Sequence, residues 1–202
     1  MKVLIACEES QAVCIAFREK GHEAYSCDLI PCSGDHPEWH LQMDVFKAIK
    51  LKKWDMMIAF PPCTFISHAG NRALKENPER KQKQMEAISF FMKLYNAPIG
   101  KICIENPRGW VTHYFRREDQ VIEPFEFGDP ERKRTCLWLK NLPPLMKGPV
   151  NPLGMIPKKV ITRKTGQREG GNYGYYYVQG KKAKDKSKTF PGIAKAMADQ
   201  WG

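Results

Sequence analysis

The sequence of 202 residues has no apolar stretch long enough to span a membrane, and no signal-type apolar core follows Met1-Lys2. Its seven cysteines are odd in number and irregularly spaced, which argues against the disulfide framework of a small secreted domain. The sequence also shows no internal repeat. We therefore expect a protein without a membrane segment, in the reducing environment of the cytoplasm.

Acidic residues are scarce relative to basic ones. The chain has 22 Asp and Glu against 33 Lys and Arg, a formal net charge of +11. Such an excess indicates a polyanionic partner such as nucleic acid, although a solvated basic surface is the alternative. With 42% hydrophobic residues the chain is long enough for one globular domain, with room for a small appendage. The oligomeric state stays open, and a monomer is the preferred expectation.

Apolar runs alternate with segments of helical periodicity over the first 104 residues, which predicts a doubly wound, mostly parallel α/β sheet. Beyond Pro107, two further runs flank a charged turn at 128–134 and predict an antiparallel hairpin. The helix at 79–95 is expected to bury Met85, Ile88, Phe91, Met92 and Tyr95. The expected strands are 2–6, 22–27, 41–44, 55–60, 101–104, 120–127 and 135–139, and the expected helices are 11–20, one beginning at Val45, 79–95 and 191–201.

The composition divides the chain into residues 1–140, 141–188 and 189–202. The middle segment is rich in Pro, Gly, Lys and Arg, with four tyrosines between 173 and 177. It is expected to be either a small nucleic-acid-facing appendage or a partly ordered tail. The last segment is expected to be a helix that buries Ile193, Met197 and Trp201, because these residues are four apart.

Two of the expected strands are followed by side chains suited to catalysis. Cys63 follows the apolar run through Pro61-Pro62, and Glu105-Asn106-Pro107 follows the run at 101–104. If these strands are neighbours, the thiol and the carboxyl group converge at the carboxyl edge of the sheet. A thiolate can add to an electrophilic ring carbon while a carboxyl group shares a proton with a ring nitrogen, which together would activate a pyrimidine. Taken singly, such a cysteine is more often an inert, packed thiol.

The two motifs resemble the catalytic Pro-Cys and Glu-Asn-Val motifs of the DNA cytosine 5-methyltransferases, in the same order. The segment from Phe127 to Arg134 is similar to that family's Phe-Gly-x-Pro-Gln-x-Arg-x-Arg segment, short by one residue, and the segment from Thr189 to Ala194 resembles its Gly-Asn-Ser/Ala-Val segment. The resemblance implies the Rossmann-like fold of methyltransferases that depend on S-adenosylmethionine. It makes 1–140 a catalytic domain, 141–188 a basic region that faces DNA, and 189–202 a helix that returns to the catalytic domain.

The resemblance also implies roles for single residues. Cys63 would attack carbon 6 of a flipped-out cytosine, and Glu105 would engage the ring at N3. A methyl group would then pass from S-adenosylmethionine to carbon 5. Arg134, with Lys133 as the competing match, would orient the base and Glu105. Ser67, His68 and Arg72, beyond the nucleophile, and Arg163, Lys164 and Arg168, in the basic region, would contact DNA.

One family feature is missing, because the glycine-rich loop after the first strand falls on Cys7-Glu8-Glu9-Ser10-Gln11-Ala12. Three possibilities stay open: a re-formed cofactor loop, an altered methyl donor, or no donor. The first is favoured, since Asp28 and Asp44 still end the strands where the family binds ribose and adenine. Members with Cys-Glu at this loop resemble compact phage enzymes. The resemblance implies that the donor contacts Cys7, Glu8, Ser10, Asp28, Leu29, Asp44, Val45 and Pro61.

Other interpretations stay open. Asp28 and Asp44 could be ordinary caps at strand ends. The chain could also be an inactive DNA-binding relative, or a relative that uses another donor or a nucleotide substrate. Separately, Cys27, Cys32, His36 and His40 have the residue types of a zinc site. Since Cys27 lies inside an expected strand and both histidines lie in a Pro-containing loop, we expect no metal.

Overall fold

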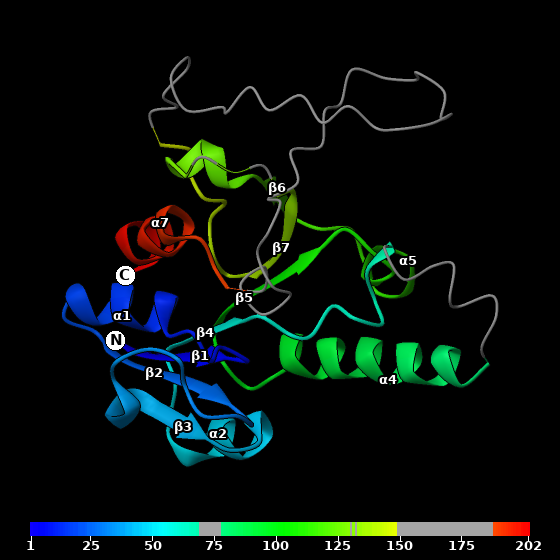
Figure 1. Ribbon diagram of the computed structural model, residues 1–202, viewed down its shortest axis with the longest axis horizontal. Coiled ribbons are helices and arrows are strands. Elements are labelled where there is room, and N and C mark those ends of the chain that lie inside the picture. Colours follow the sequence, from blue (N-terminus) through cyan, green and yellow to red (C-terminus); the bar gives the residue numbers. More distant parts are fainter. Residues whose placement is uncertain (69–77, 130, 132, 149–187) are drawn as a thin grey trace.

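The computed structural model describes residues 1–68, 78–129, 131, 133–148 and 188–202. Within these residues seven strands form one sheet in the order β3-β2-β1-β4-β5-β7-β6 (Figure 1). The strands are β1 (Lys2–Ala6), β2 (Glu23–Asp28), β3 (His40–Gln42), β4 (Met56–Ala59), β5 (Lys101–Pro107), β6 (Gln120–Ile122) and β7 (Thr135–Lys140). The helices are α1 (Ala12–Glu19), η1 (Pro37–Trp39), α2 (Val45–Leu51), α4 (Pro78–Tyr95), α5 (Val111–Tyr114), η3 (Pro124–Phe127) and α7 (Pro191–Trp201).

The sheet is parallel except at one edge. Strand β1 pairs parallel to both β2 and β4, and β4 pairs parallel to β5. Strand β7 is antiparallel to both β5 and β6. The predicted fold class, a doubly wound and mostly parallel α/β sheet with an antiparallel hairpin, is therefore confirmed. The strand order reverses between β1 and β4, and such a switch point is where open α/β sheets bind their ligands.

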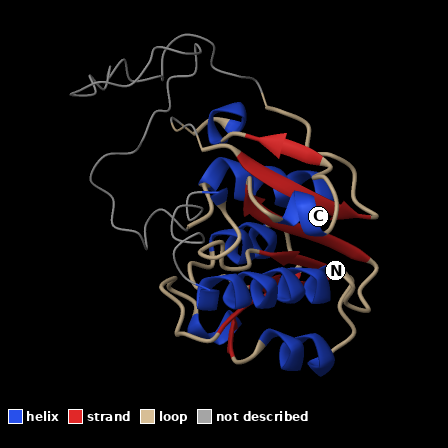
Figure 2. Cartoon of the chain, turned by 90° about the vertical axis from the view of Figure 1, so that its right-hand side faces the viewer, coloured by secondary structure: helices blue, strands red, loops and turns tan. Residues whose placement is uncertain are grey.

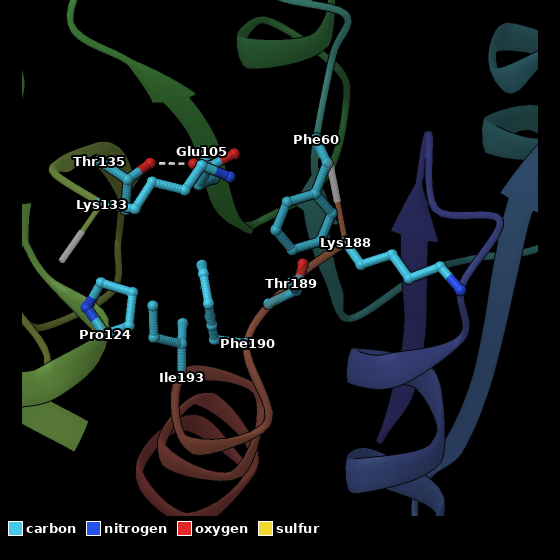
Figure 3. Close-up of a pocket in the computed structure, with 9 residues that line it drawn as sticks. All are labelled: Phe60, Glu105, Pro124, Lys133, Thr135, Lys188, Thr189, Phe190 and Ile193. Carbon is cyan, nitrogen blue, oxygen red and sulfur yellow. Dashed lines mark hydrogen bonds between the residues drawn. The ribbon is translucent and has the colours of Figure 1, made fainter. Parts of the chain in front are cut away.

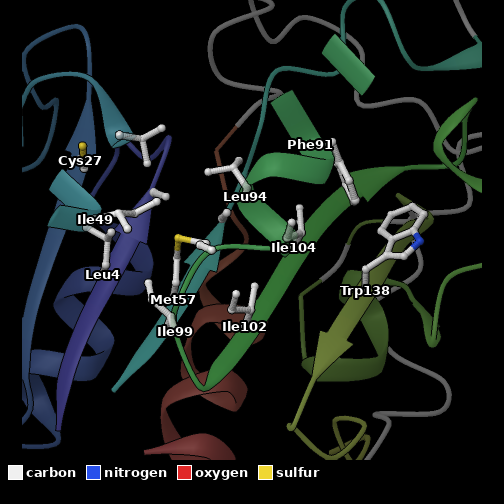
Figure 4. Packing of buried hydrophobic residues seen from close by; sticks show 14 of the residues in the cluster. Leu4, Cys27, Ile49, Met57, Phe91, Leu94, Ile99, Ile102, Ile104 and Trp138 are labelled. Carbon is white, nitrogen blue, oxygen red and sulfur yellow. The ribbon is translucent and has the colours of Figure 1, made fainter. Parts of the chain in front are cut away.

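Helices cover both faces of the sheet, which buries the inner strands on both sides (Figure 2). Leu4 of β1 belongs to the apolar cluster that holds α2 and α4, whereas its neighbours Val3 and Ile5 belong to the cluster that holds α1 and α7. This alternation follows from the two-residue period of a strand. Figure 4 shows the first cluster, where Phe91 meets Trp138 edge to face with ring centroids 5.0 Å apart. In the described part of the chain, no helix is both long and apolar enough to cross a membrane.

The two long helices agree with their sequence patterns at most positions. Helix α7 has the predicted bounds, and Ile193, Met197 and Trp201 are buried as predicted. Helix α4 begins one residue before its predicted start, and the prediction that Met85 lies on its buried face is wrong, because this side chain is 40% exposed. The buried residue of that turn is Gln84, whose amide donates to the carbonyl of Phe65.

Three predicted strands end two or more residues from their observed ends, and the other strand bounds differ by one residue at most. Strand β6 ends at Ile122 because Pro124 begins the 3-10 helix η3, in which Glu123 and Glu126 form a capping box. Strand β5 continues to Pro107 because β7 pairs with it over that length. Strand β3 ends two residues before Asp44, and the Asp44 carboxylate accepts from the first backbone amides of α2.

Candidate active site

The loops that follow β1 and β4 lie side by side at the switch point of the sheet. The register pairs Ala6 with Ala59, and the amide of Phe60 donates to the carbonyl of Ala6 over 2.9 Å. Residues 7–11 and the Pro61-Pro62-Cys63 segment leave the sheet from these two positions. The sheet therefore brings the predicted cofactor loop and the predicted nucleophile to the same edge.

Glu105 lies in a pocket at the end of β5 (Figure 3). Its carboxylate accepts a hydrogen bond from the hydroxyl of Thr135, the first residue of β7. Burial raises the pKa of the Glu105 carboxyl, and the Lys133 ammonium partly opposes this rise. A carboxyl group in such surroundings takes up a proton more readily than an exposed one, so it can donate a hydrogen bond to a ring nitrogen.

The Cys63 thiol is half-buried and interacts electrostatically with the same two groups. Burial is the main reason why its pKa is raised; the negative charge of Glu105 adds to the rise, and Lys133 counteracts it. Cys63 itself does not line the pocket that contains Glu105. The structure thus brings the thiol near enough to interact electrostatically with the carboxyl and ammonium groups that line the pocket.

Asn106 fixes the loop that carries Cys63. Its buried side-chain amide donates to the carbonyl of Pro61 over 2.7 Å, which links the end of β5 to the loop after β4. A second link lies further out, where Ser67 and Gly109 form an antiparallel bridge. A side chain at position 109 would not fit, because its Cβ would lie 2.0 Å from the carbonyl oxygen of Ile66. The second residue of Glu-Asn-Pro therefore positions the Cys63 loop.

The two candidates for the orienting cation lie in different places. Lys133 lines the pocket with Glu105, and its ammonium lies 5.7 Å from the centroid of the Phe190 ring. Arg134 is exposed, and its Nε lies 3.6 Å from a carboxylate oxygen of Glu123. The geometry at Glu105 thus favours Lys133, the competing match, for this role.

The wall of the pocket opposite Glu105 comes from the chain terminus. Thr189, Phe190 and Ile193 contribute to the lining, together with Pro124 of η3 (Figure 3). The Asp129 carboxylate holds the start of α7 by accepting from the amide of Gly192 over 3.0 Å. Two segments that resemble family motifs, 127–134 and 189–194, therefore meet at this pocket.

The loop after β1 adopts a glycine-like backbone without glycine. Cys7 and Gln11 have positive φ angles of 58° and 62°. The Glu8 side chain turns inward, and its carboxylate accepts from the amides of Val13 and Cys14 over 2.7 and 3.2 Å. Burial raises the pKa of Glu8 to about 7, because these two hydrogen bonds offset only part of the desolvation. The loop is thus re-formed around a carboxylate that caps α1.

Most of the other predicted cofactor residues lie at or beyond the ends of β1, β2 and β3, and Pro61 follows β4. Burial raises the pKa of Cys7, and the negative charges of Asp28 and Asp44 add to this rise, so the three groups are close. Leu29 is 71% exposed, whereas Val45 is buried at the start of α2. Of the remaining two, Ser10 accepts a weak hydrogen bond of 3.5 Å from the amide of Ala12, and Pro61 is buried within the Cys63 loop.

The predicted DNA-contacting residues divide into two groups. Ser67 and His68 lie on the loop after Cys63, with His68 exposed. Arg72, Arg163, Lys164 and Arg168 lie outside the described residues.

The side chains considered for zinc have other partners. The His40 ring forms hydrogen bonds with the Ser26 hydroxyl over 2.8 Å and with the Ile30 carbonyl over 2.9 Å. The His36 ring stacks on the Trp39 ring. Among the residues that the structure describes, no group of three or more His, Cys, Asp or Glu side chains is placed to hold a metal ion.

Sequence reasoning missed three residues at this edge. The hydroxyl of Thr135 donates a hydrogen bond to the carboxylate of Glu105. Both carboxylate oxygens of Glu9 are buried, and the described structure gives them no hydrogen-bond partner. Ile30 is 47% exposed beside Leu29, which is unusual for two large apolar side chains in sequence. Glu9 lies in the glycine-free loop, so its position carried a signal that could have been followed. No sequence pattern marks the hydrogen bond of Thr135, because it depends on the antiparallel register of β5 and β7.

The strand order, with an antiparallel strand inserted beside β5, is typical of the Rossmann-like fold of S-adenosylmethionine-dependent methyltransferases. The chain therefore has a methyltransferase-like fold. It is structurally similar to a candidate DNA modification methyltransferase encoded within a prophage of E. coli, with a TM-score of 0.43 and 12% identity. The similarity covers 69% of this chain and 46% of that one, so the chain spans about half the length of that protein. No family model and no curated protein matches the sequence.

Proposed function

We propose that this chain is a DNA cytosine 5-methyltransferase that acts through a covalent adduct at Cys63. The observation that carries the proposal is the electrostatic coupling of the Cys63 thiol with the Glu105 carboxyl, at the ends of two neighbouring parallel strands. A nucleophile on the loop after one strand and an acid near the end of the neighbouring strand can act on two atoms of one pyrimidine ring.

The chemistry follows from these two groups. Cys63 adds as thiolate to carbon 6 of an extruded cytosine, while Glu105 donates its proton to N3, which places electron density on carbon 5. Lys133 favours the thiolate of Cys63. It also opposes the rise in the pKa of Glu105, but burial outweighs this opposition, so the carboxyl group still takes up a proton more readily than an exposed one. After the methyl group is in place, a base takes the proton from carbon 5 and the thiolate leaves. N3 then returns its proton to Glu105, which restores the ring.

The residues around the β1 loop fit S-adenosylmethionine. The donor, when bound, supplies an electrophilic methyl group on a sulfonium centre. Asp28 would accept from the ribose hydroxyls, and exposed Leu29, with Asp44 nearby, would cover the adenine. The buried carboxylate of Glu9 suits a cationic group, and the donor carries an ammonium and a sulfonium.

The test uses a duplex that carries 5-fluorocytosine at the target position. Fluorine cannot leave carbon 5 as a proton does, so the enzyme stays attached to DNA through Cys63. In the presence of the donor we expect an adduct that survives denaturation, together with methyl transfer to ordinary cytosine. Cys63→Ala should abolish both, and Glu105→Gln should slow transfer by about 100-fold or more. Failure of the wild-type protein to transfer a methyl group to cytosine would contradict the proposal.

A second candidate function arises from the loop after β1. The Glu8 carboxylate occupies the amino-terminal end of α1, where a bound anion would otherwise be placed, so a relative with an altered donor or a nucleotide substrate also fits. Mass spectrometry of treated DNA and of free pyrimidine nucleotides separates these cases by the mass added. An inactive DNA-binding relative would add no mass to either substrate.

A further inference from the structure

Four ring side chains gather beside the Cys63 loop, and we call them the ring cluster: His68, Trp110, His113 and Tyr114. Trp110 is its centre, with ring centroids 5.6 Å from His68, 5.3 Å from His113 and 6.2 Å from Tyr114. The rings cross at angles between 48° and 71°. Neither His113 nor Tyr114 stacks parallel to Trp110, so Trp110 does not cover the ring faces of these two residues.

The backbone holds the ring cluster against the loop of the nucleophile. The amide of Trp110 donates to the carbonyl of Ile66 over 2.7 Å, and the bridge between Ser67 and Gly109 lies next to it. The carbonyl of Cys63 accepts from the amides of Ile66 and Ser67. A ligand of the ring cluster would therefore lie beside the proposed reaction site and on the same edge of the sheet.

Exposure and charge indicate what this ligand is. His68, His113 and Tyr114 are exposed, Tyr114 by 43%, whereas the central Trp110 is half-buried. The neighbouring Arg108 and Arg117 are also exposed, and the whole chain carries a net charge of +11. Flat rings beside cations are suited to single-stranded or unstacked nucleic acid, where bases stack and phosphates pair with the cations.

We propose that the ring cluster is a stacking surface for an unpaired base next to the extruded pyrimidine. This inference rests on the proposed function, since extrusion of a base breaks the stacking of its neighbours. Tyr114 and His113 supply the stacking faces, and Trp110 holds them in place. Exposed Arg108, two residues before Trp110, would contact the adjoining phosphate.

The test measures binding of fluorescein-labelled DNA by anisotropy, in a Cys63→Ser background that cannot form the adduct. One duplex has a mispaired target cytosine with an unpaired neighbour, and the other is fully paired. We expect the double variant with His113→Ala and Tyr114→Ala to bind the mispaired duplex about 10-fold more weakly, and the paired duplex nearly as before. Tyr114→Phe keeps the ring and should retain the parent's affinity.

Two controls accompany this test. A variant at Met85 distinguishes base stacking from a general loss of DNA binding, and an acidic peptide tests whether the surface prefers acidic proteins. Met85 lines a groove beside α4 that Tyr114 also borders, so Met85→Ala should leave binding unchanged. An acidic peptide should compete poorly with DNA. Equal binding by the double variant and its parent, or an equal loss in Met85→Ala, would overturn the inference, as would efficient competition by the peptide. If one of these results occurs while the parent binds DNA and the wild type transfers methyl groups, only the inference fails. If the parent binds no DNA, the proposed function fails too.

Discussion

Glu105, Lys133 and Cys63 form an electrostatically coupled set in which one cation acts on two acids. The positive charge of Lys133 lowers the pKa of both the thiol and the carboxyl group, while burial raises both. The proposed reaction requires the thiol ionised and the carboxyl protonated, so we expect its rate to depend on pH through both groups together. Thr135 adds to the set by donating its hydroxyl to the carboxylate.

Replacement of Lys133 tests this arrangement at the level of one residue. In Lys133→Met both pKa values rise, so we expect both limbs of the pH profile of kcat/KM to move to higher pH, with kcat at neutral pH reduced about tenfold. Lys133→Arg keeps the charge and should keep the limbs in place. Arg134→Met is the matched control, since Arg134 pairs with Glu123 outside the pocket. If the limbs of the pH profile moved in Arg134→Met but not in Lys133→Met, Arg134 and not Lys133 would be the cation that acts on Glu105 and Cys63.

The sequence was sufficient to find the candidate catalytic residues but not the side chains that contact them. Cys63 and Glu105 could be found because each follows an apolar strand. The hydroxyl of Thr135 could not, since its partner depends on the antiparallel register that sets Thr135 opposite Pro107. The same register decides which cation lies in the pocket, and a sequence alignment short by one residue could not choose between Lys133 and Arg134.

At the scale of elements, the loops after β4 and β5 are fastened together at Gly109. A methyl group at this position would lie 2.0 Å from the carbonyl oxygen of Ile66, which is backbone and cannot rotate away. Gly109→Ala should therefore displace the Cys63 loop, lower the free energy of unfolding by about 1–3 kcal/mol, and reduce transfer more than it reduces DNA binding. Urea unfolding and single-turnover transfer assays measure the two effects.

The matched control for this change is Gly100→Ala. Position 100 has open space around its Cβ and no positive φ, so stability and transfer should remain near wild type. Similar losses in both variants would show that the contact at Gly109 is not the cause.

Helix α1 depends on an ionisable cap that is buried. Glu8 has a pKa of about 7 in the folded protein, against an ordinary value of 4.5. Because the folded pKa is the higher one, the contribution of Glu8 to stability is complete below pH 4.5 and is lost as the pH rises through 7, by about 3 kcal/mol in total.

We expect Glu8→Gln to remove this part of the pH dependence, because an amide does not ionise. Urea unfolding at pH 5 and pH 8 measures it: the wild type should lose stability between the two, and the variant should lose less. Glu19→Gln, at the exposed far end of the same helix, should behave like the wild type. A variant as pH-dependent as the wild type would show that Glu8 ionises freely in the folded protein.

Elements with strong apolar periodicity could be predicted from the sequence, and those determined by pairing or capping could not. The apolar run at 56–60 predicted a strand because a strand buried on both faces is apolar throughout. The four-residue spacing in α7 predicted a helix because a helix buried on one side has apolar residues along one stripe. The strand predicted at 120–127 was wrong in its second half because Pro124 favours the start of a helical turn. The role of Glu8 was missed, since an inward-turned carboxylate is rare and no pattern marks it.

At the scale of the whole molecule, the excess of positive charge is concentrated in one segment. Residues 149–187 contain nine of the 33 Lys and Arg residues and only two acidic ones. If DNA is the partner, its affinity should fall steeply with salt, because each phosphate that a cation neutralises releases a bound counterion. The sequence predicts that Arg163, Lys164 and Arg168 are among these cations.

Combined replacement of Arg163, Lys164 and Arg168 by Ala should weaken DNA binding equally for all sequences. The slope of log affinity against log salt concentration should become less steep by about 3, close to one unit per phosphate contact. Lys47→Ala with Lys50→Ala, two exposed positions on α2, is the control and should leave the slope unchanged. Binding is measured by anisotropy between about 50 and 200 mM salt in the Cys63→Ser background. An unchanged slope in the triple variant, with an altered slope in the control, would mean that DNA contacts α2 and not Arg163, Lys164 and Arg168.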